Sequence, residues 1–385
     1  MKRDPKSRRL RAGIVGGGPG SFIGGIHRIA AELDSQALVM AGAMSADPDK
    51  AQRSAAAWNL ERSYASFEQM AKEEADHIEG IDFVMITTPN HMHFPVAKAF
   101  LEAGIHVVCD KPITLTLEEA RELTKIVERR KMIFALTHND IAYPAVQQAR
   151  QMVQDGKLGT IRKVMVEYIQ DWLMDPLENS GQKQASWRLD PARSGISCCV
   201  SDIGTHAENL LEFITGVGIH SLCADFTSFL PGRQLEDDAN ILLRLENGGK
   251  GTLICSQIAC GEENNLNIRV YGSLAGLEWH QQEPNTLKFK PKGKPWEYYR
   301  TGNGYMGDEA KALTRTPAGH PEGFLESFAG IYKLAIADIR RVQNGDLPLG
   351  GYPTVQDGLR GLNFVVKAVE SAKKGAVWVT ILNNP

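Results

Sequence analysis

The chain has 385 residues, of which 43% are hydrophobic and 23% charged, with a formal net charge of −3. This length predicts two domains, because a single hydrophobic core rarely grows beyond about 250–300 residues. The composition is that of a globular protein, and the near-neutral charge gives no reason to expect nucleic acid or an anionic membrane as a partner. No apolar run approaches the roughly 20 residues that a membrane-spanning helix needs.

The cysteines predict neither a disulfide framework nor a metal site. No pair has the CxxC spacing of a zinc site, and the six are scattered over Cys109, Cys198, Cys199, Cys223, Cys255 and Cys260. The adjacent pair Cys198-Cys199 could be redox-active, but buried thiols that act as small hydrophobic groups are the simpler interpretation. Since no secretory apolar region follows the amino terminus, we expect a cytoplasmic protein with reduced thiols.

The first third of the chain alternates strand and helix patterns. Expected strands are 10–16, 37–43, 81–87, 107–108 and 132–136, and expected helices are 26–33, 51–58, 67–75, 95–103 and 117–130. This alternation with short connections predicts an α/β domain over residues 1–140, with a doubly wound parallel sheet covered by helices on both faces. Ligands of such sheets bind at the carboxyl ends of the strands.

The pattern changes after residue 140. Expected helices are 145–153, 201–215, 324–342 and 359–372, and expected strands are 163–172, 219–229, 239–245, 251–258, 266–271 and 276–280. These patterns predict an α+β domain over residues 141–385, with a mostly antiparallel sheet and helices on one face. The segment 284–317 is rich in Gly, Pro and Lys, so we expect a long loop or flap there.

A glycine-dense loop follows the first expected strand. It reads Gly16-Gly17-Gly18-Pro19-Gly20-Ser21-Phe22-Ile23-Gly24-Gly25. Glycines allow a pyrophosphate to approach the backbone, and the following helix offers free N–H groups. Its spacing is longer than G-x-G-x-x-G by three residues, and a plain tight turn is the alternative. The position between strand and helix favours a nucleotide site, with Gly16, Gly18, Gly20, Ser21, Phe22 and Ile23 as the contacts.

Further polar residues follow the later strands. Thr88, Asn90 and His93 come after 81–87, and Asp110-Lys111-Pro112 comes after 107–108. Both segments fall at the carboxyl edge of the predicted sheet, where the nicotinamide end of a dinucleotide could be held. A solvated lysine after a strand is the alternative for Lys111.

Asp202 and His206 stand four residues apart on an expected helix, so they share a face. Oxidation of a secondary alcohol needs a proton acceptor beside the hydroxyl, and a histidine suits that role near neutral pH. Asp202 could fix the tautomer of the imidazole, and Lys111 could stabilise the reacting oxygen or share the role of base. A buried structural histidine is the alternative.

The order of glycine loop, Thr88 to His93, Asp110-Lys111-Pro112 and Asp202-x-x-x-His206 resembles the Gfo/Idh/MocA oxidoreductase family over almost the whole chain. The resemblance implies a Rossmann domain, a second domain with a large open sheet, and hydride transfer with NAD(P) at secondary hydroxyls of sugars or cyclitols. It implies Lys111, Asp202 and His206 as catalytic residues, and a homo-oligomer. Asp110 stands where the family has Glu, and the glycine loop is longer than the common pattern.

The residue at the end of the second expected strand bears on cofactor choice. The resemblance places Ser45 there, where an acidic residue would hold the ribose 2′-OH of NAD. Lys50 and Arg53 follow and could reach a 2′-phosphate, but no arginine comes directly after the strand. We expect NAD, with NADP as the alternative.

The substrate candidates combine polar and aromatic side chains, which suits a pyranose ring. They are His138, Asn139, Gln170, Asp171, Trp172, Trp187, Arg188 and His320. The two tryptophans could equally be core residues, and His320 could simply lead into a helix. We expect oxidation at C3 of a glycoside or related pyranose, with inositol dehydrogenase as the enzymatic alternative. A nucleotide-binding regulator or a structural interaction protein are the non-enzymatic alternatives.

Overall fold

The computed structural model describes residues 8–18 and 20–381, and it divides into two compact units. The first unit holds the chain up to Asn139 together with Phe324–Leu359, and the second holds Asp140–Gly323 with the chain from Arg360 onward. The expected division between residues 140 and 141 therefore lies one residue from the first boundary. Residues 324–359, expected in the second domain, return to the first unit.

The first unit is built on a six-stranded parallel sheet with the order β3-β2-β1-β4-β5-β6. The central strands are apolar and buried, as a sheet covered on both faces requires. The strands are β1 (Leu10–Gly16), β2 (Ala37–Ala43), β3 (Arg62–Ser63), β4 (Phe83–Thr87), β5 (His106–Cys109) and β6 (Phe134–Leu136). The chain order reverses between β1 and β4, and this is where ligands of doubly wound sheets bind.

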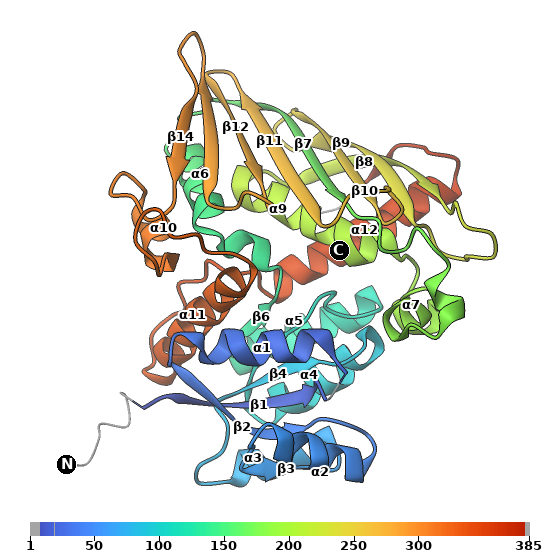
Figure 1. Cartoon of the computed structure of the whole chain (residues 1–385), viewed down its shortest axis with the longest axis vertical. Helices are drawn as coiled ribbons and strands as arrows, with labels where there is room; N and C mark the ends of the chain where they lie inside the picture. Colours follow the sequence, from blue (N-terminus) through green and yellow to red (C-terminus); the bar gives the residue numbers. More distant parts are fainter. Residues whose placement is uncertain (1–7, 19, 382–385) are drawn as a thin grey trace. The chain divides into compact units, whose positions relative to one another are not determined.

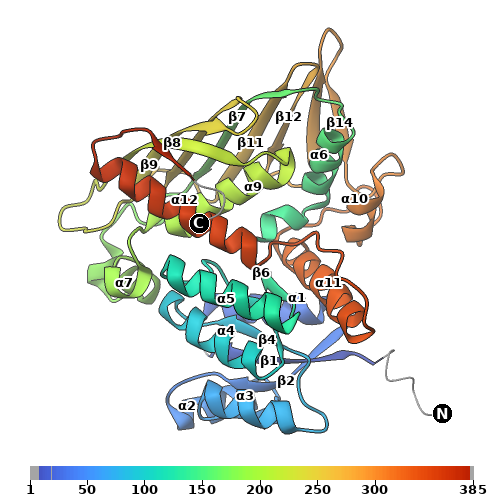
Figure 2. The same cartoon turned by 180° about the vertical axis from the view of Figure 1, so that it is seen from behind.

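Helices cover both faces of this sheet. They are α1 (Phe22–Leu33), α2 (Pro48–Ala57), α3 (Phe67–Asp76), α4 (His93–Glu102), α5 (Leu117–Arg130) and α11 (Phe324–Gln343). Figure 1 shows α1 over one face, and Figure 2 shows α4 and α5 over the other. Side chains cap several helix starts: Ser21 accepts from the Gly24 N–H of α1, and Thr116 forms a capping box with Glu119 of α5.

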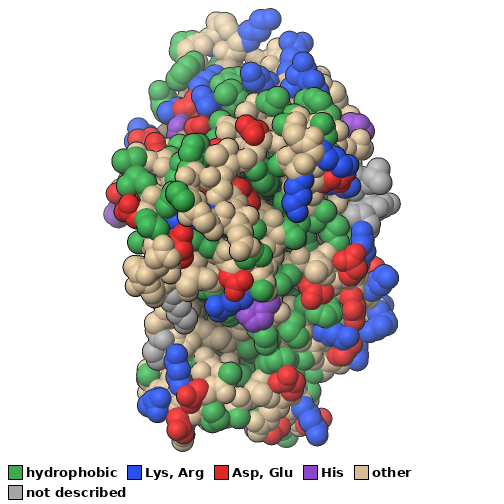
Figure 3. Space-filling model, turned by 90° about the vertical axis from the view of Figure 1, so that its right-hand side faces the viewer, with side chains coloured by type: hydrophobic (Ala, Val, Ile, Leu, Met, Phe, Trp, Pro, Cys, Tyr) green, Lys and Arg blue, Asp and Glu red, His purple; other side chains and the backbone are tan. Residues whose placement is uncertain are grey.

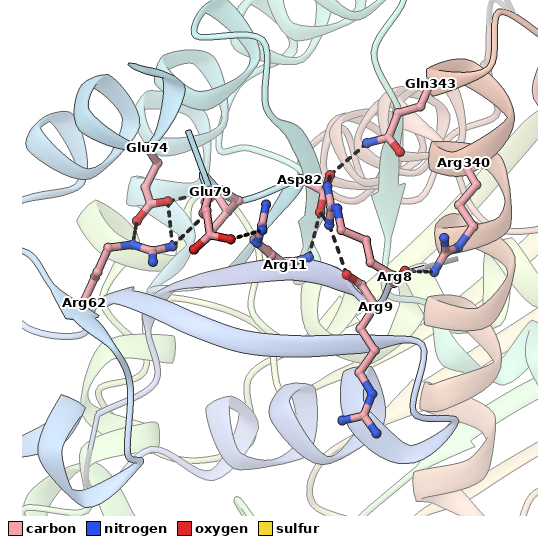
Figure 4. A network of polar contacts seen from close by, with 10 residues as sticks. Arg8, Arg9, Arg11, Arg62, Glu74, Glu79, Asp82, Arg340 and Gln343 are labelled. Carbon is pink, nitrogen blue, oxygen red and sulfur yellow. Dashed lines mark hydrogen bonds and ion pairs between the residues drawn. The ribbon is translucent and has the colours of Figure 1, made fainter. Parts of the chain in front are cut away.

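Charged side chains tie β1, β4 and α11 together at the amino edge of the sheet (Figure 4). Asp82 directly precedes β4 and accepts hydrogen bonds from both terminal nitrogens of Arg8 at 2.7 Å. It also accepts from the backbone N–H of Arg11 and from Gln343 of α11. Burial alone would raise the pKa of Asp82, but these hydrogen bonds and the Arg8 charge lower it.

A second buried carboxylate, Glu74 of α3, holds the edge strand β3 in the same figure. Arg62 of β3 donates to both oxygens of Glu74, at 2.6 and 3.1 Å. The Tyr64 hydroxyl and the Ile81 N–H also donate to it. Since these donors come from residues 62–64 and from Ile81, Glu74 of α3 connects the short strand to the remainder of the unit.

The second unit is built on a nine-stranded sheet with the order β14-β13-β12-β11-β7-β10-β9-β8-β15. All neighbours are antiparallel except β7 and β10, which confirms the expected mostly antiparallel sheet. The strands are β7 (Ile161–Ile169), β8 (Ile219–Thr227), β9 (Asp238–Leu245), β10 (Lys250–Ser256), β11 (Asn265–Gly272), β12 (Ala275–His280), β13 (Thr286–Pro291), β14 (Glu297–Arg300) and β15 (Val379–Thr380).

Long helices pack on one face of this sheet, as Figures 1 and 2 show. They are α6 (Pro144–Gln154), α9 (Thr205–Thr215) and α12 (Val355–Lys373), and the shorter helices are α7 (Lys183–Arg188), α8 (Pro191–Ser194) and α10 (Asp308–Leu313). The core lies between these helices and alternate strand residues such as Val164, Val166, Leu253 and Ile268.

The segment 284–317 differs from the expected long loop, because it contains β13, β14 and α10. On β13, Leu287 and Phe289 are buried while Lys288 and Lys290 face outward and contact Glu278 of β12. The alternation of lysine with apolar residues is therefore a strand pattern. The high Gly and Pro content of the flanks concealed it.

The surface carries charges of both signs. On the face in Figure 3, basic and acidic side chains are interspersed, in keeping with the formal net charge of −3. No helix among the described residues is long and apolar enough to cross a membrane. All six cysteines are free thiols, and four of them are buried.

Candidate functional site

The glycine loop joins β1 to α1 by a close backbone approach. Gly16 has a φ of 86°, and a Cβ atom there would lie 2.9 Å from the carbonyl oxygen of Thr87. A Cβ atom on Gly24 would lie 2.3 Å from the Cα atom of Gly17, closer than any side chain allows. Gly24 therefore supplies the close helix packing that the third glycine of G-x-G-x-x-G usually provides.

The residues between Gly17 and Gly24 form the longer loop predicted from the sequence. A Cβ atom on Gly18 would lie 2.9 Å from the carbonyl oxygen of Met44, so the loop also passes tightly beside the end of β2. Ser21 caps α1, Phe22 is 68% exposed at its first residue, and Ile23 follows. Gly20 has space around it, and Pro19 lies outside the described residues. The start of α1 thus presents backbone N–H groups to an anion.

The end of β2 holds the residues expected to govern cofactor choice. Ser45 is half-buried, and its hydroxyl accepts from the backbone N–H of Asp47 at 3.2 Å. Asp47 caps α2 by accepting from the N–H of Lys50 at 3.0 Å. The nearest acidic side chain after the strand is therefore engaged in capping, and the Lys50 side chain is exposed.

Thr88, Asn90 and His93 follow β4. Thr88 Oγ1 is buried and has no hydrogen-bond partner among the described residues. Asn90 begins the short helix η2 (Asn90–Met92) and is buried. Both ring nitrogens of His93 lie on backbone oxygens, Nδ1 at 2.6 Å from Pro112 and Nε2 at 3.0 Å from Thr88. His93 thus joins the loops after β4 and β5, and burial lowers its pKa.

Asp110 and Lys111 follow β5. Asp110 Oδ1 accepts from the N–H of Lys111 at 2.9 Å and from Thr137 Oγ1 at 3.1 Å. The Lys111–Pro112 peptide bond is cis. Asp110 fixes the backbone that carries Lys111, whose side chain is half-buried at the carboxyl edge of the sheet.

His138 and Asn139 are buried directly after β6. Asn139 Nδ2 donates to Ser327 Oγ of α11 at 2.8 Å. Residues that follow β1, β2, β4, β5 and β6 therefore lie at the carboxyl edge of one parallel sheet in the first unit. The glycine packing, the Thr88 hydroxyl, which has no partner among the described residues, and the backbone N–H groups at the start of α1 fit a dinucleotide.

In the second unit, Asp202 lies in a π-helical turn (Val200–Gly204) that continues into α9, which carries His206. The expected helix 201–215 is thus present, with an irregular first turn of a kind common at functional sites. His206 Nδ1 lies 2.5 Å from Oδ2 of Asp140, and both side chains are buried. From the sequence we expected Asp202 to orient the imidazole, but Asp140 lies at Nδ1 in the structure.

Asp202 has its own partners. Gln257 Nε2 donates to Asp202 Oδ2 at 2.8 Å, and Arg188 Nε forms an ion pair with the same oxygen at 3.3 Å. Arg188 also donates to Gln184, and its guanidinium lies over the rings of Trp187 and Trp172, 4.5 and 5.7 Å from their centres. The structure therefore joins Asp202, Arg188 and both tryptophans.

Buried polar groups hold the turn that carries Asp202. Glu236 accepts from Ser197 Oγ, from the Cys198 N–H and from the Val200 N–H. Burial raises the pKa of Glu236, and these hydrogen bonds partly oppose that shift. The backbone ahead of Asp202 is therefore anchored to the chain just before β9.

Tyr168 of β7 packs edge-on against the His206 ring at 5.8 Å. Its hydroxyl donates to Asn264 Oδ1 at 2.8 Å, and Gln170 Nε2 donates to the same oxygen. Burial raises the pKa of Tyr168 well above its usual value, and the charges of Asp140 and Asp202 raise it further. The phenol stays protonated, which leaves His206 as the base of this cluster.

Two expected substrate residues lie apart from these contacts. Asp171 Oδ2 accepts from the Gly261 N–H at 3.2 Å and so supports the turn that carries Asn264. His320 is exposed, and its described contacts are with Pro317 and Thr316. These contacts of His320 are with its own loop and not with the residues that surround Asp202 and His206.

Five residues of this cluster were not predicted from the sequence: Asp140, Tyr168, Glu236, Gln257 and Asn264. Asp140 directly follows His138-Asn139 at the end of an expected strand, which is a signal that could have been used. The other four sit in strands or loops without a motif. Within residues 8–18 and 20–381, no group of three or more His, Cys, Asp or Glu side chains could hold a metal ion.

Comparison with known proteins identifies both units. Residues 10–138 match the family model of the oxidoreductase family with an NAD-binding Rossmann fold, and residues 146–278 match that of the GFO/IDH/MocA C-terminal domain. An oxidoreductase of Bacillus subtilis, YfiI, is 34% identical over 381 residues, which cover 97% of each chain.

Solved structures and characterised relatives extend the comparison. An inositol dehydrogenase homolog from Azotobacter vinelandii, crystallised with NAD⁺, has a TM-score of 0.94 and 35% identity, covering 97% of this chain and 98% of that one. Levoglucosan dehydrogenase from Pseudarthrobacter phenanthrenivorans is 24% identical over 311 residues, 73% of this chain and 76% of the relative. The first unit is thus an NAD-binding Rossmann domain.

Proposed function

The chain belongs to the Gfo/Idh/MocA family of NAD-binding oxidoreductases, and we propose that it oxidises a secondary ring hydroxyl of a sugar, glycoside or cyclitol. The observation that carries this proposal is the His206 imidazole, held through Nδ1 by a buried carboxylate beside a tyrosine that stays protonated. Alcohol oxidation needs such a base, whereas a nucleotide-binding regulator or an interaction protein has no use for it.

The nicotinamide of bound NAD supplies the hydride acceptor. Gly16, Gly18 and the start of α1 would hold its pyrophosphate, and Gly20, Ser21, Phe22 and Ile23 border that position. Ser45 would contact the adenosine ribose, with Lys50 nearby. Thr88, Asn90 and Asp110 would line the nicotinamide site. His93 would stabilise these loops through its hydrogen bonds to the backbone oxygens of Pro112 and Thr88.

His206 takes the hydroxyl proton in this proposal. A carboxylate only accepts hydrogen bonds, so Nδ1 carries the proton of the neutral ring, and the lone pair on Nε2 takes the hydroxyl proton. Lys111 donates to the substrate oxygen and stabilises the negative charge that grows on it. Asp202 supplies a fixed negative charge for the cation that forms on the histidine. Because Gln257 and Arg188 hold one of its oxygens, Asp202 keeps this position.

The side chains around Asp202 support this substrate class. Trp172, Trp187 and Gln170 combine aromatic faces with an amide, which suits a ring that has an apolar face and hydroxyls on its edge. Arg188 is already paired with Asp202 and Gln184, so a neutral substrate fits better than an anionic one. We propose His138 and Asn139 as further substrate contacts, whereas Asp171 supports the neighbouring turn. In its more specific form, the proposal is oxidation at C3 of a pyranose.

An inositol is the second candidate. It is favoured by the likeness, at 35% identity over almost the whole chain, to the inositol dehydrogenase homolog of Azotobacter vinelandii. Both candidates present a secondary ring hydroxyl to the same groups, so the chemistry assigned to Lys111 and His206 is the same for both.

A turnover screen tests the proposal. The purified protein would be incubated with NAD or NADP and with inositols, free sugars, levoglucosan and glycosides, and formation of reduced nicotinamide would be followed by absorbance. We expect turnover with at least one cyclic polyol and a preference for NAD. If NAD binds but no member of the panel is oxidised, the substrate class is wrong. If NAD does not bind, the proposal as a whole fails.

A further inference from the structure

We infer that Asp140, and not Asp202, is the residue that positions the imidazole of His206 and selects its tautomer; this inference rests on the function proposed above. Asp140 lies on the short helix η3 (Asn139–Ala142) after β6, whereas His206 lies on α9, 66 residues later. Their side chains are 4% and 9% exposed and meet at 2.5 Å. A buried hydrogen bond to a carboxylate is charge-assisted, and such bonds are among the stronger hydrogen bonds in proteins.

The contact has a chemical consequence. With Asp140 as acceptor, Nδ1 must hold the proton of the neutral ring, and Nε2 is left as the nitrogen that can take a proton. Without Asp140, either nitrogen could carry the proton, and only one of the two tautomers can act as a base at Nε2. Asp140 therefore acts through His206 and is a positioning residue.

The surroundings of the ring support this division. Tyr168 packs edge-on against the imidazole, and its hydroxyl is held by Asn264, so the ring is restricted from the side as well as at Nδ1. Asp202 Oδ2 is engaged by Gln257 and Arg188. The two carboxylates thus have separate tasks, although only Asp202 belongs to the sequence motif.

The test reads the tautomer directly. Imidazole ¹⁵N spectra of histidine-labelled protein would be recorded at a pH where the ring is neutral, with the His206 signals assigned by their loss in His206→Gln. We expect a protonated Nδ1 and an unprotonated Nε2 in the wild type. Asp140→Asn should move the ring to a mixture or to the opposite tautomer, while Asp202→Asn should leave it unchanged. Asp225→Asn, at an exposed position on β8, is the matched control.

Turnover gives the second readout. Asp140→Asn should lower kcat by roughly 10²–10⁴ with little change in KM, the range for loss of a tautomer-selecting carboxylate. A wild-type ring protonated at Nε2, or an Asp140→Asn ring with the wild-type tautomer, would overturn the inference. The wild-type spectrum alone can overturn the inference, by showing a ring protonated at Nε2, even if the Asp140→Asn variant does not fold. Since the spectra need no substrate, a correct tautomer without turnover on any polyol would count against the proposed function and not against the role of Asp140.

Discussion

The two edges of the parallel sheet in the first unit differ in how their polar groups are satisfied. At the amino edge, the buried carboxylates Asp82 and Glu74 face the guanidinium groups of Arg8 and Arg62 at 2.6–2.7 Å. At the carboxyl edge, the sheet presents closely packed glycines, the buried hydroxyl of Thr88 without a described partner, and the half-buried Lys111.

This difference indicates that the amino edge of the sheet contributes mainly to stability and that the carboxyl edge is available for binding. Carboxylates whose oxygens already accept several hydrogen bonds hold segments of the chain together, but they offer no hydrogen-bonding group to a ligand. Glycines and unsatisfied donors contribute little to folding and leave room for a cofactor. Substitutions at the amino edge should therefore change the free energy of unfolding. Substitutions at the carboxyl edge should change cofactor binding or turnover, and should also change the free energy of unfolding where they disturb the glycine packing.

Among substitutions at the two edges of the sheet, the largest effect is expected for Lys111→Ala. If this side chain stabilises the reacting oxygen, kcat should fall by roughly 10²–10³. The NAD dissociation constant and the unfolding free energy should change little, because Asp110 and Thr137 hold the loop without the lysine side chain. Steady-state kinetics with calorimetric NAD binding would measure both. Lys125→Ala, at an exposed position of α5, is the control, and near wild-type kcat in Lys111→Ala would remove this residue from the mechanism.

Asp82→Asn should lower the free energy of unfolding and leave turnover unchanged, the reverse of what is expected for Lys111→Ala. Loss of a buried carboxylate that accepts charged hydrogen bonds should lower the unfolding free energy by about 1.5–3 kcal/mol, at the lower end because Arg8 is partly exposed. Turnover per folded molecule should be unchanged. Denaturant unfolding at neutral pH measures the first effect, and a fall in kcat would show that the two edges are not separate.

The same variant has a defined pH dependence. The folded pKa of Asp82 is lowered, so its contribution is fully present above the unfolded value of about 3.9 and is lost as the pH falls through the folded pKa. Wild-type stability should therefore decline towards Asp82→Asn below about pH 4. A gap between the two proteins that stays constant down to pH 2 would contradict this account.

Gly24→Ala and Gly25→Ala form a matched pair on α1. A Cβ atom at Gly24 would meet the Gly17 backbone at 2.3 Å, whereas none of the surrounding atoms lies within 4 Å of a Cβ atom at Gly25. Gly24→Ala should cost about 1–3 kcal/mol, shared between unfolding and weaker NAD binding. Gly25→Ala should stabilise the helix by about 0.5–1 kcal/mol and leave NAD binding intact. Equal behaviour of the two would show that the loop is not held by this packing.

The smallest effect is expected for Ser45→Asp. A carboxylate at this position should accept from the ribose 2′-OH of NAD and repel a 2′-phosphate. Near the surface, the repulsion of one charge is worth about 1 kcal/mol, so NADP affinity should fall roughly fivefold relative to NAD. Ser45→Ala controls for loss of the hydroxyl. If both cofactors respond alike to the new charge, Ser45 does not lie beside the ribose.

Much of the fold could be predicted because its signals are local. Strand and helix patterns marked the elements from β1 to α6 except the two-residue strand β3, and the glycines, Lys111, Asp202 and His206 stood in short motifs. Asp140 could not be assigned to His206 in this way, since 66 residues separate them and only folding brings them together. Gln257, Asn264 and Glu236 each contribute one side chain to the hydrogen bonds of this cluster, and a single side chain produces no periodic pattern in the sequence. The strands β13 and β14 were concealed by the glycines and prolines around them.

Isotope transfer tests the central claim most directly. A polyol identified by the turnover screen would carry deuterium at the carbon of its reacting secondary hydroxyl, and the reduced nicotinamide would be isolated and analysed by mass spectrometry. We predict that the deuterium is recovered on the nicotinamide, and that Lys111→Ala transfers it far more slowly. Recovery of the label in the solvent, or reduced nicotinamide without deuterium, would contradict hydride transfer from a secondary hydroxyl.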